Sequence, residues 1–305
     1  MGYLYLILSK LSATGKIVAM KYCAMNAPGA KNSVLINLCR SGICALVGLL
    51  IWLIGGATVT TGAEGYLIIL LSGIANALIL FVWIMATSYA SVSLIEVFST
   101  LGGVIIPVLL APVLFPGETV SIWQLLATAL LIVSAVLFSG KGNGEEKKGG
   151  VVKWILMALV VLSMAGVSLS QKLFANYDSA NINYFNFLTF LFAFVGFVIY
   201  YLIITLSQKQ KVQATVTEES REKEKFPIGK VWYLIVIASV TLYAFQVLMT
   251  LATGLLDAGI VYPLSYAVGL IMVFVVDIIL FKEKITVKNT VGLVLAIVAC
   301  VLANL

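Results

Sequence analysis

Long apolar stretches separated by polar connections run through the whole chain. They cover roughly residues 3–24, 33–54, 66–88, 92–114, 121–139, 151–172, 181–206, 231–253, 258–281 and 288–304. Each is close to the ~20 residues that a helix needs to cross ~30 Å of hydrocarbon. The short alternating segments of a membrane barrel are not visible, and backbone amides in lipid must then be bonded within helices. The pattern predicts an all-α membrane protein with ten transmembrane helices.

Composition supports the same class. The 305 residues are 62% hydrophobic and 10% charged, with a mean hydropathy of +1.10, which excludes a water-soluble domain. The first stretch has no basic leading segment or clear cleavage site and contains Lys10 and Lys16. We therefore expect it to be a membrane span and not a signal peptide.

Cysteine and histidine usage argues against metal or disulfide chemistry. Cys23, Cys39, Cys44 and Cys300 lie in or beside apolar stretches without zinc-like spacing, and the chain has no histidine. We expect no metal and no cofactor. Without histidine or clustered carboxylates at membrane depth, an enzyme is also disfavoured.

The chain repeats itself. The motif Glu118-Thr-Val-Ser121 recurs as Glu283-Lys-Ile-Thr286, 165 positions later, between matching apolar stretches. A second match, which includes Lys21 and Lys172, is offset by 151 positions. Each half holds five of the predicted spans. Since five is odd, the second half should enter the membrane upside down relative to the first.

These matches predict two five-helix repeats. The first covers residues 1–139, the second covers 151–305, and 140–150 is a glycine-rich, charged, flexible linker. The charged segment 207–230 reads as a solvated loop inside the second repeat.

Positive charge lies on one side of this arrangement. The connections after the first, third, fifth, seventh and ninth spans, which we call the lysine-rich side, carry Lys31, Lys141, Lys147, Lys148, Lys153, Lys209, Lys211, Arg221, Lys223, Lys225, Lys230, Lys282, Lys284 and Lys288. The opposite side, which holds both ends of the chain, is called the termini side. The positive-inside rule makes the lysine-rich side cytoplasmic. The net charge of +6 then needs no nucleic-acid partner.

Two inverted five-helix halves, each with this glutamate motif before its last helix, resemble the drug/metabolite transporter superfamily in its EamA-like branch. Gly15, Lys21, Arg40 and Pro107 are similar as well. The resemblance implies a secondary transporter with a central cavity near mid-membrane. Members of that superfamily have both termini in the cytoplasm, opposite to the lysine distribution, so the orientation stays open.

Three charges lie inside spans, where each costs roughly 2.5 to 3.5 kcal/mol at a helix centre. Lys16, Arg40 and Glu96 fall in the same half of the bilayer when their depths are counted along the helices. We expect them in or beside the cavity. In the alternative, Arg40 and Glu96 form a structural bridge and Lys16 extends towards a headgroup. Lys21 and Lys172, at span ends, are expected to anchor the protein at the interface.

Neutral polar and aromatic residues complete the predicted substrate site, since ligand pockets combine apolar walls with a few placed polar groups. The alternative is that they only join helices. They are Asn37, Asn76, Trp83, Tyr184, Asn186, Gln246, Tyr262, Ser265 and Tyr266.

The repeated motif also has a structural interpretation. Ser121 and Gln124 have the spacing of a capping box, and Thr286 with Asn289 is a weaker version. Glu118 and Glu283 precede helix starts, where the macrodipole favours a carboxylate. Transport chemistry is the alternative role. Pro107, Pro112 and Pro263 lie inside equivalent spans and indicate either gating helices or static kinks.

These features predict an alternating-access secondary transporter in the cytoplasmic membrane for a small polar or zwitterionic metabolite, with an amino acid or related carboxylate as first choice. Arg40 and Lys16 would attract a carboxylate, and Glu96 an amino group or a coupling proton. Cationic drugs or amines, sugar-phosphate-like solutes and, with less support, a channel are the alternatives. Expected partners are the substrate, the bilayer and a coupling proton or counter-substrate, in a monomer or homodimer.

Overall fold

A computed structural model describes residues 1–27, 30–59, 62–86, 89–90, 92–115, 117–138, 150–177, 181–213, 228–280 and 287–305. Within these ranges the regular structure is entirely helical. The elements are α1 (Gly2–Asn26), α2 (Ala30–Ile54), α3 (Ala63–Ala86), α4 (Val92–Thr100), η1 (Leu101–Ile105), α5 (Ile106–Leu114), α6 (Ile122–Phe138), α7 (Gly150–Ala175), α8 (Ile182–Gln213), α9 (Ile228–Leu255), α10 (Ala258–Ile279) and α11 (Val287–Leu302).

Seven of the described helical stretches are long and apolar enough to cross a membrane. They are Asn32–Ile54, Ala63–Trp83, Val97–Leu114, Gly150–Ala175, Ile182–Ile203, Ile228–Leu255 and Ala258–Val276. The apolar parts of α6 and α11 are shorter, and α1 carries three lysines. The predicted all-α membrane fold is therefore confirmed.

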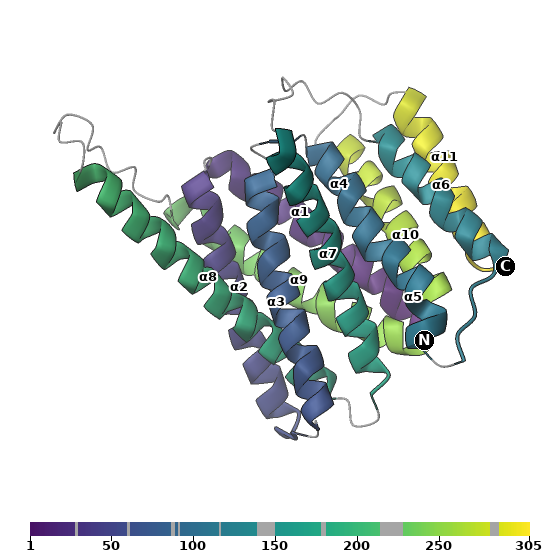
Figure 1. Cartoon of the computed structure of the whole chain (residues 1–305), viewed down its shortest axis with the longest axis horizontal. Helices are drawn as coiled ribbons and strands as arrows, with labels where there is room; N and C mark the ends of the chain where they lie inside the picture. Colours follow the sequence, from purple (N-terminus) through teal and green to yellow (C-terminus); the bar gives the residue numbers. More distant parts are fainter. Residues whose placement is uncertain are drawn as a thin grey trace.

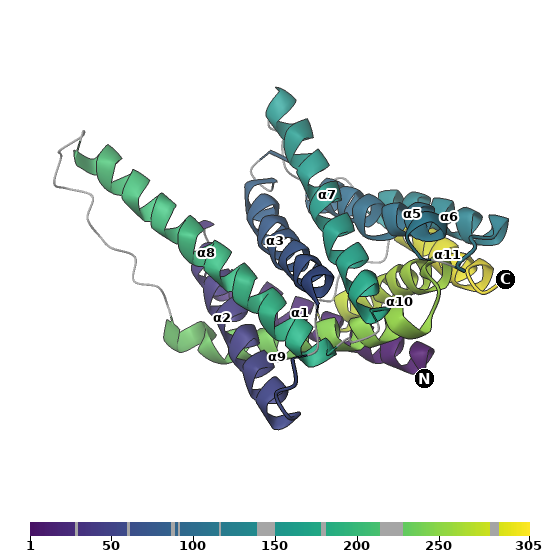
Figure 2. The same ribbon diagram turned by 60° about the horizontal axis from the view of Figure 1, so that its bottom comes forward.

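Helices from the two halves of the chain pack side by side (Figure 1). The closest pairs are α1 with α9, α3 with α7, α2 with α8, and α6 with α11. Further packing joins α3 to α8, α2 to α9, α1 to α10, and α7 to the stretch formed by α4, η1 and α5. In Figure 2, α8 with α2 and α6 with α11 lie at opposite edges of the molecule. Neither half is a separate body.

The termini side is held together by contacts between distant segments. The Tyr3 hydroxyl donates a hydrogen bond to Asn304 Oδ1 over 2.9 Å, and the Asn181 side-chain amide donates to the Thr58 carbonyl, also over 2.9 Å. Figure 1 accordingly shows both chain ends at the same end of the bundle. The connection from α2 to α3 and the one from α7 to α8 meet there too.

The helical stretch that begins with α4, which we call the fourth span, contains a π-helical turn, η1, between α4 and α5. Pro107 follows it and has no N–H to donate to the carbonyl of Gly103, four residues earlier. Ser168 on α7 fills this gap, because its hydroxyl donates to that carbonyl over 3.0 Å. Gly102 permits the approach of α7, since a Cβ there would collide with the Val161 carbonyl oxygen.

We predict that Gly102→Ala lowers the melting temperature, because the added methyl group meets backbone and overpacking typically costs about 1–3 kcal/mol. Gly229→Ala is the matched control: a Cβ there meets nothing within 4 Å, and alanine is the better helix former. Thermal unfolding in detergent measures both. Equal melting temperatures would show that α7 does not approach η1 this closely.

Candidate functional site

Several polar side chains are buried among the described helices with an atom that has no hydrogen-bond partner. Such an atom costs about 1–3 kcal/mol, so each calls for an explanation. The atoms are Asn37 Oδ1, Arg40 Nε, Ser72 Oγ, Gln171 Nε2, Asn186 Oδ1, Thr189 Oγ1, the Tyr243 hydroxyl and Gln246 Nε2. Four of the residues, Asn37, Arg40, Asn186 and Gln246, belong to the site predicted from the sequence.

Arg40 and Lys16 share one region of the bundle. Arg40 is only 6% exposed, and the thiol of Cys44, one turn further along α2, lies within electrostatic reach of both cations. The Cys44 thiol also donates to the Ser239 carbonyl on α9 over 3.3 Å. This region therefore lies where α1, α2 and α9 meet. Asn37 is buried one turn before Arg40.

Lys16 also contacts α9 directly. The Nζ atoms of Lys10 and Lys16 lie 5.1 Å and 5.4 Å from the centroid of the Phe245 ring, within the range of cation–π attraction. Gln246, the next residue, is 2% exposed. Two ammonium groups and a guanidinium are thus brought to neighbouring faces of α1, α2 and α9, where an anionic group would be stabilised.

Tyr184 lies elsewhere, in an aromatic cluster at the termini side. Its ring centroid is 5.2 Å from that of Trp52, and its hydroxyl is 3.4 Å from that of Tyr66. Phe174 and Phe185 stack beside it, with centroids 4.4 Å apart. This cluster joins α2, α3, α7 and α8.

A polar layer lies on the inner side of the aromatic cluster. Ser72, Gln171 and Thr189 are each about one helical turn from a member of the packed group that includes Ile69, Phe174 and Phe185, always in the direction away from the termini side. All three are almost fully buried. The sequence analysis missed these three residues, although it selected Gln246 and Ser265 on the same kind of evidence.

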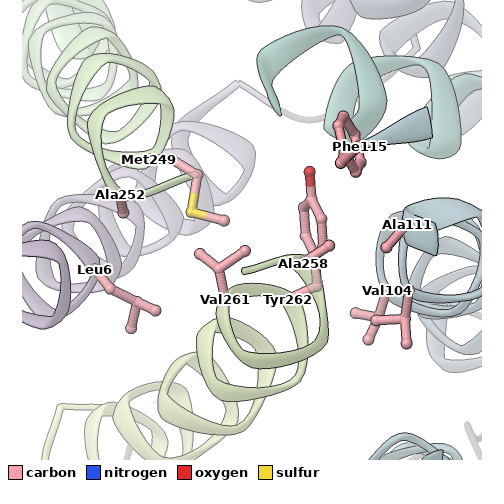
Figure 3. Close-up of a cluster of buried hydrophobic side chains, with 10 residues drawn as sticks. Leu6, Val104, Ala111, Phe115, Met249, Ala252, Ala258, Val261 and Tyr262 are labelled. Atoms are coloured by element: carbon pink, nitrogen blue, oxygen red, sulfur yellow. The ribbon is translucent and has the colours of Figure 1, made fainter. Parts of the chain in front are cut away.

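Other predicted site residues are occupied by contacts within the protein. The Tyr262 hydroxyl donates to the Ser168 carbonyl over 2.7 Å, and the Ser265 hydroxyl to Met249 Sδ over 3.7 Å. Figure 3 shows the Tyr262 hydroxyl directed towards Phe115 within an apolar cluster. These contacts fit the alternative in which such residues join helices.

Three more residues also have packing or local roles. Trp83 packs in an apolar group between α3, α4 and α7. The Asn76 side chain donates to the Ser72 carbonyl of its own helix over 2.9 Å, and Tyr266 packs between two apolar groups around α10. None of these contacts involves Arg40.

Three residues of the predicted site and repeated motif fall outside what the structure describes. These are Glu283 and Thr286, together with the side chain of Glu96. The predicted linker, apart from Gly150 at the start of α7, and most of the charged loop also lie outside the described ranges. The ends of the predicted loop are helical, because α8 continues to Gln213 and α9 begins at Ile228. The predicted roles of Glu96 and Glu283 stay predictions.

Glu118 and Lys172 form a buried ion pair at the termini side. Lys172 Nζ is 2.6 Å from Glu118 Oε1, and the side chains are 2% and 12% exposed. Gly117, with φ of +90°, makes the turn that carries Glu118 inward from the end of α5. The expectation that Lys172 anchors the protein at the lipid interface is therefore wrong.

Both ions also bond to helix ends. Lys172 donates to the carbonyls of Thr253 and Leu256 at the end of α9, over 2.9 Å and 2.8 Å. The second oxygen of Glu118 accepts the Ala258 N–H at the start of α10 over 2.8 Å. Cations are favoured at helix C-termini and anions at N-termini. Glu118 thus caps a helix of the other half of the chain and not the one that follows it.

The capping box is confirmed. The Ser121 hydroxyl accepts the Gln124 N–H over 3.2 Å, and Gln124 Oε1 accepts the Ser121 N–H over 3.1 Å. The pairing of Glu118 with Lys172 was missed, although both residues belong to the repeated matches and both lie beside the ends of apolar stretches.

Together, these features define a multi-pass helical membrane protein with buried polar groups in two places. One is where α1, α2 and α9 meet, and the other is on α3, α7 and α8. The chain belongs to the EamA-like transporter family, whose family model matches residues 152–305. A solved structure titled "Crystal structure of protein" has a similar fold, with a TM-score of 0.74 over 99% of this chain and 96% of the other, at 13% identity. No curated protein matches the sequence.

We predict that reversing both charges, as Glu118→Lys with Lys172→Glu, does not restore the stability lost in Lys172→Met. Removing one member of a buried pair costs about 3–5 kcal/mol. An ordinary ion pair could be swapped, but here the swap places a carboxylate against α9 carbonyls and an ammonium against the Ala258 amide.

Thermal unfolding of the single and double variants measures this effect. Glu64→Gln, which removes an exposed acidic charge in the first turn of α3, is the control and should change stability by less than about 0.5 kcal/mol. Full recovery in the double swap would mean that the helix ends contribute nothing to the pair.

Proposed function

We propose that the protein is a secondary active transporter that moves a small polar or zwitterionic organic metabolite across the cytoplasmic membrane by alternating access. Its membership of a transporter family supports the class. The observation that carries the site is Arg40, a buried guanidinium whose Nε has no hydrogen-bond partner, in the same region as Lys16. An anionic group of a substrate would accept the hydrogen bond that Arg40 Nε does not make within the protein.

The ten-helix inverted repeat is part of this proposal. The two halves can be exchanged element by element: α1 with α7, α2 with α8, α3 with α9, the α4–η1–α5 stretch with α10, and α6 with α11. This exchange converts the packing of α1 on α9 into that of α3 on α7. It likewise converts the packing of α3 on α8 into that of α2 on α9. The pairs α2 with α8 and α6 with α11 convert into themselves. Such exchange is what two repeats related by a two-fold axis produce.

An amino acid or related carboxylate is the first choice of substrate. Arg40 and Lys16 would bind the carboxylate, because a charge-assisted hydrogen bond is strongest away from water. Asn37 Oδ1, Asn186 Oδ1 and Gln246 Nε2 would supply an uncharged acceptor or donor for the remainder of the molecule. Glu96 is retained as the candidate for an amino group or a coupling proton.

A phosphate-bearing solute is the second candidate. Lys10 adds a third cation, as it lies over the same Phe245 ring as Lys16. Three cations suit a doubly charged anion better than a cationic drug or amine. A thermal-shift screen with carboxylates, amino acids and phosphate esters separates these classes, because a ligand that binds only the folded state raises stability.

We predict that Arg40→Met raises the KM for uptake into proteoliposomes about tenfold or more, since a hydrogen bond to a charged group contributes about 1.5–3 kcal/mol. Lys16→Met should act in the same direction. Trp123→Phe, on the exposed face of α6 and outside the predicted site, is the control and should leave KM unchanged. If neither Arg40→Ala nor Glu96→Gln changes uptake, the assignment of the substrate site is refuted.

We predict that reporters inserted beside Pro116 and beside Lys282 lie in opposite compartments, because the two repeats enter the membrane in opposite directions. The positive-inside rule places Lys282 in the cytoplasm. Compartment-specific labelling of single introduced cysteines measures both positions. Two reporters in the same compartment would exclude the inverted repeat.

A further inference from the structure

The bundle is packed more tightly at the termini side than at the lysine-rich side. Near the termini side α7 packs against α9, where a Cβ on Gly254 would lie 3.2 Å from that of Ala175, and α10 packs against η1 and α5. If the two halves are exchanged, the contact of α7 with α9 corresponds to a contact of α1 with α3. The contact of α10 with α5 corresponds to a contact of α10 with α4. Those pairs show no comparable packing in the ranges that the structure describes.

The tightly packed side is joined by the ion pair of Glu118 and Lys172. Lys172 has three donors, and Glu118, Thr253 and Leu256 provide three acceptors. The other oxygen of Glu118 bonds to Ala258. This single pair therefore joins the connection after α5, the end of α7, the end of α9 and the start of α10.

A second contact lies one turn further along the same face of α7. Ser168 donates to the Gly103 carbonyl that Pro107 leaves unbonded, and the carbonyl of Ser168 accepts the Tyr262 hydroxyl. The fourth span, α7 and α10 are thereby joined by side-chain hydroxyls and not by apolar packing alone. Prolines and π turns are places where a helix can bend.

We propose that Glu118 and Lys172 form a latch that holds the termini side closed, and that the latch must separate before substrate can pass to that side. This rests on the proposed alternating-access function. A buried ion pair suits a latch because its attraction is largely offset by desolvation, and water that enters on opening solvates both charges again. An apolar contact of equal size would regain nothing from that water.

Accessibility to a membrane-impermeant maleimide tests the latch. The probe site is Ala111→Cys on α5, which is fully buried beside Phe115 and Tyr262, in a protein whose four native cysteines are replaced. We expect Lys172→Met to increase labelling from the termini side several-fold. Lys21→Met, at the equivalent position of the first repeat, is the control and should not increase labelling.

A disulfide gives a second test that does not depend on removing a buried charge. Cysteines at Ala175 and Gly254 should form a disulfide, because their Cβ atoms would be close to the usual ~3.5–4.5 Å. Oxidation should stop uptake and reduction should restore it. Cysteines at Ala75 and Gly166, which join α3 to α7, are the control pair. The equivalent helices α9 and α1 are also packed together, so we expect the contact of α3 with α7 to persist when the other side opens. Oxidation of this pair should therefore leave uptake intact.

The outcomes separate the two proposals. Unchanged labelling in Lys172→Met, or uptake that continues through the oxidised Ala175–Gly254 pair, overturns the latch. Absence of uptake in the parent protein with increased labelling in Lys172→Met overturns the transport proposal and supports a termini side that the ion pair holds closed. Increased labelling in Lys21→Met as well would show general loosening and overturn the latch.

Discussion

Backbone hydrogen bonding without water governs this structure. In hydrocarbon every N–H and C=O needs a partner in the protein, and the helix provides one everywhere except at its ends and at prolines. At three such places the partner is a side chain from another segment of the chain. Ser168 bonds to the carbonyl freed by Pro107, Lys172 to the end of α9, and Glu118 to the start of α10. The exceptions to the helical pattern thus become the points at which separate segments are joined.

Some of this could be predicted from the sequence. The apolar stretches predict the helices, and the capping box of Ser121 and Gln124 is local, so three residues of spacing suffice to find it. The partner of Glu118 is a tertiary matter, and a lysine at a span end looks the same whether it faces lipid headgroups or a carboxylate. The π turn was also hidden, because Pro107 marks a break but the form of the break depends on Gly102 meeting α7.

The candidate substrate site was predicted only in part, again because tertiary contacts decide which residues lie together. A charge in an apolar stretch indicates burial, which Arg40 confirms, but periodicity alone does not show which neighbour a helix face meets. Trp83 and Tyr184 were grouped with Arg40 by residue type, whereas the structure places them in separate apolar and aromatic groups. Gln171 and Thr189 were overlooked because the sequence does not distinguish them from other neutral residues such as Gln246; their burial beside one another's helices is a tertiary property.

Phe245 has a mechanical consequence for α1. Lys10 and Lys16 leave that helix in directions about 120° apart, at 3.6 residues per turn, yet both ammonium groups converge on this one ring. Turning α1 about its own axis in either sense draws one of them away from the aromatic face. The ring therefore adds to the packing of α1 on α9 in resisting rotation of α1 about its own axis. Any rearrangement of the bundle should move these two helices as a unit.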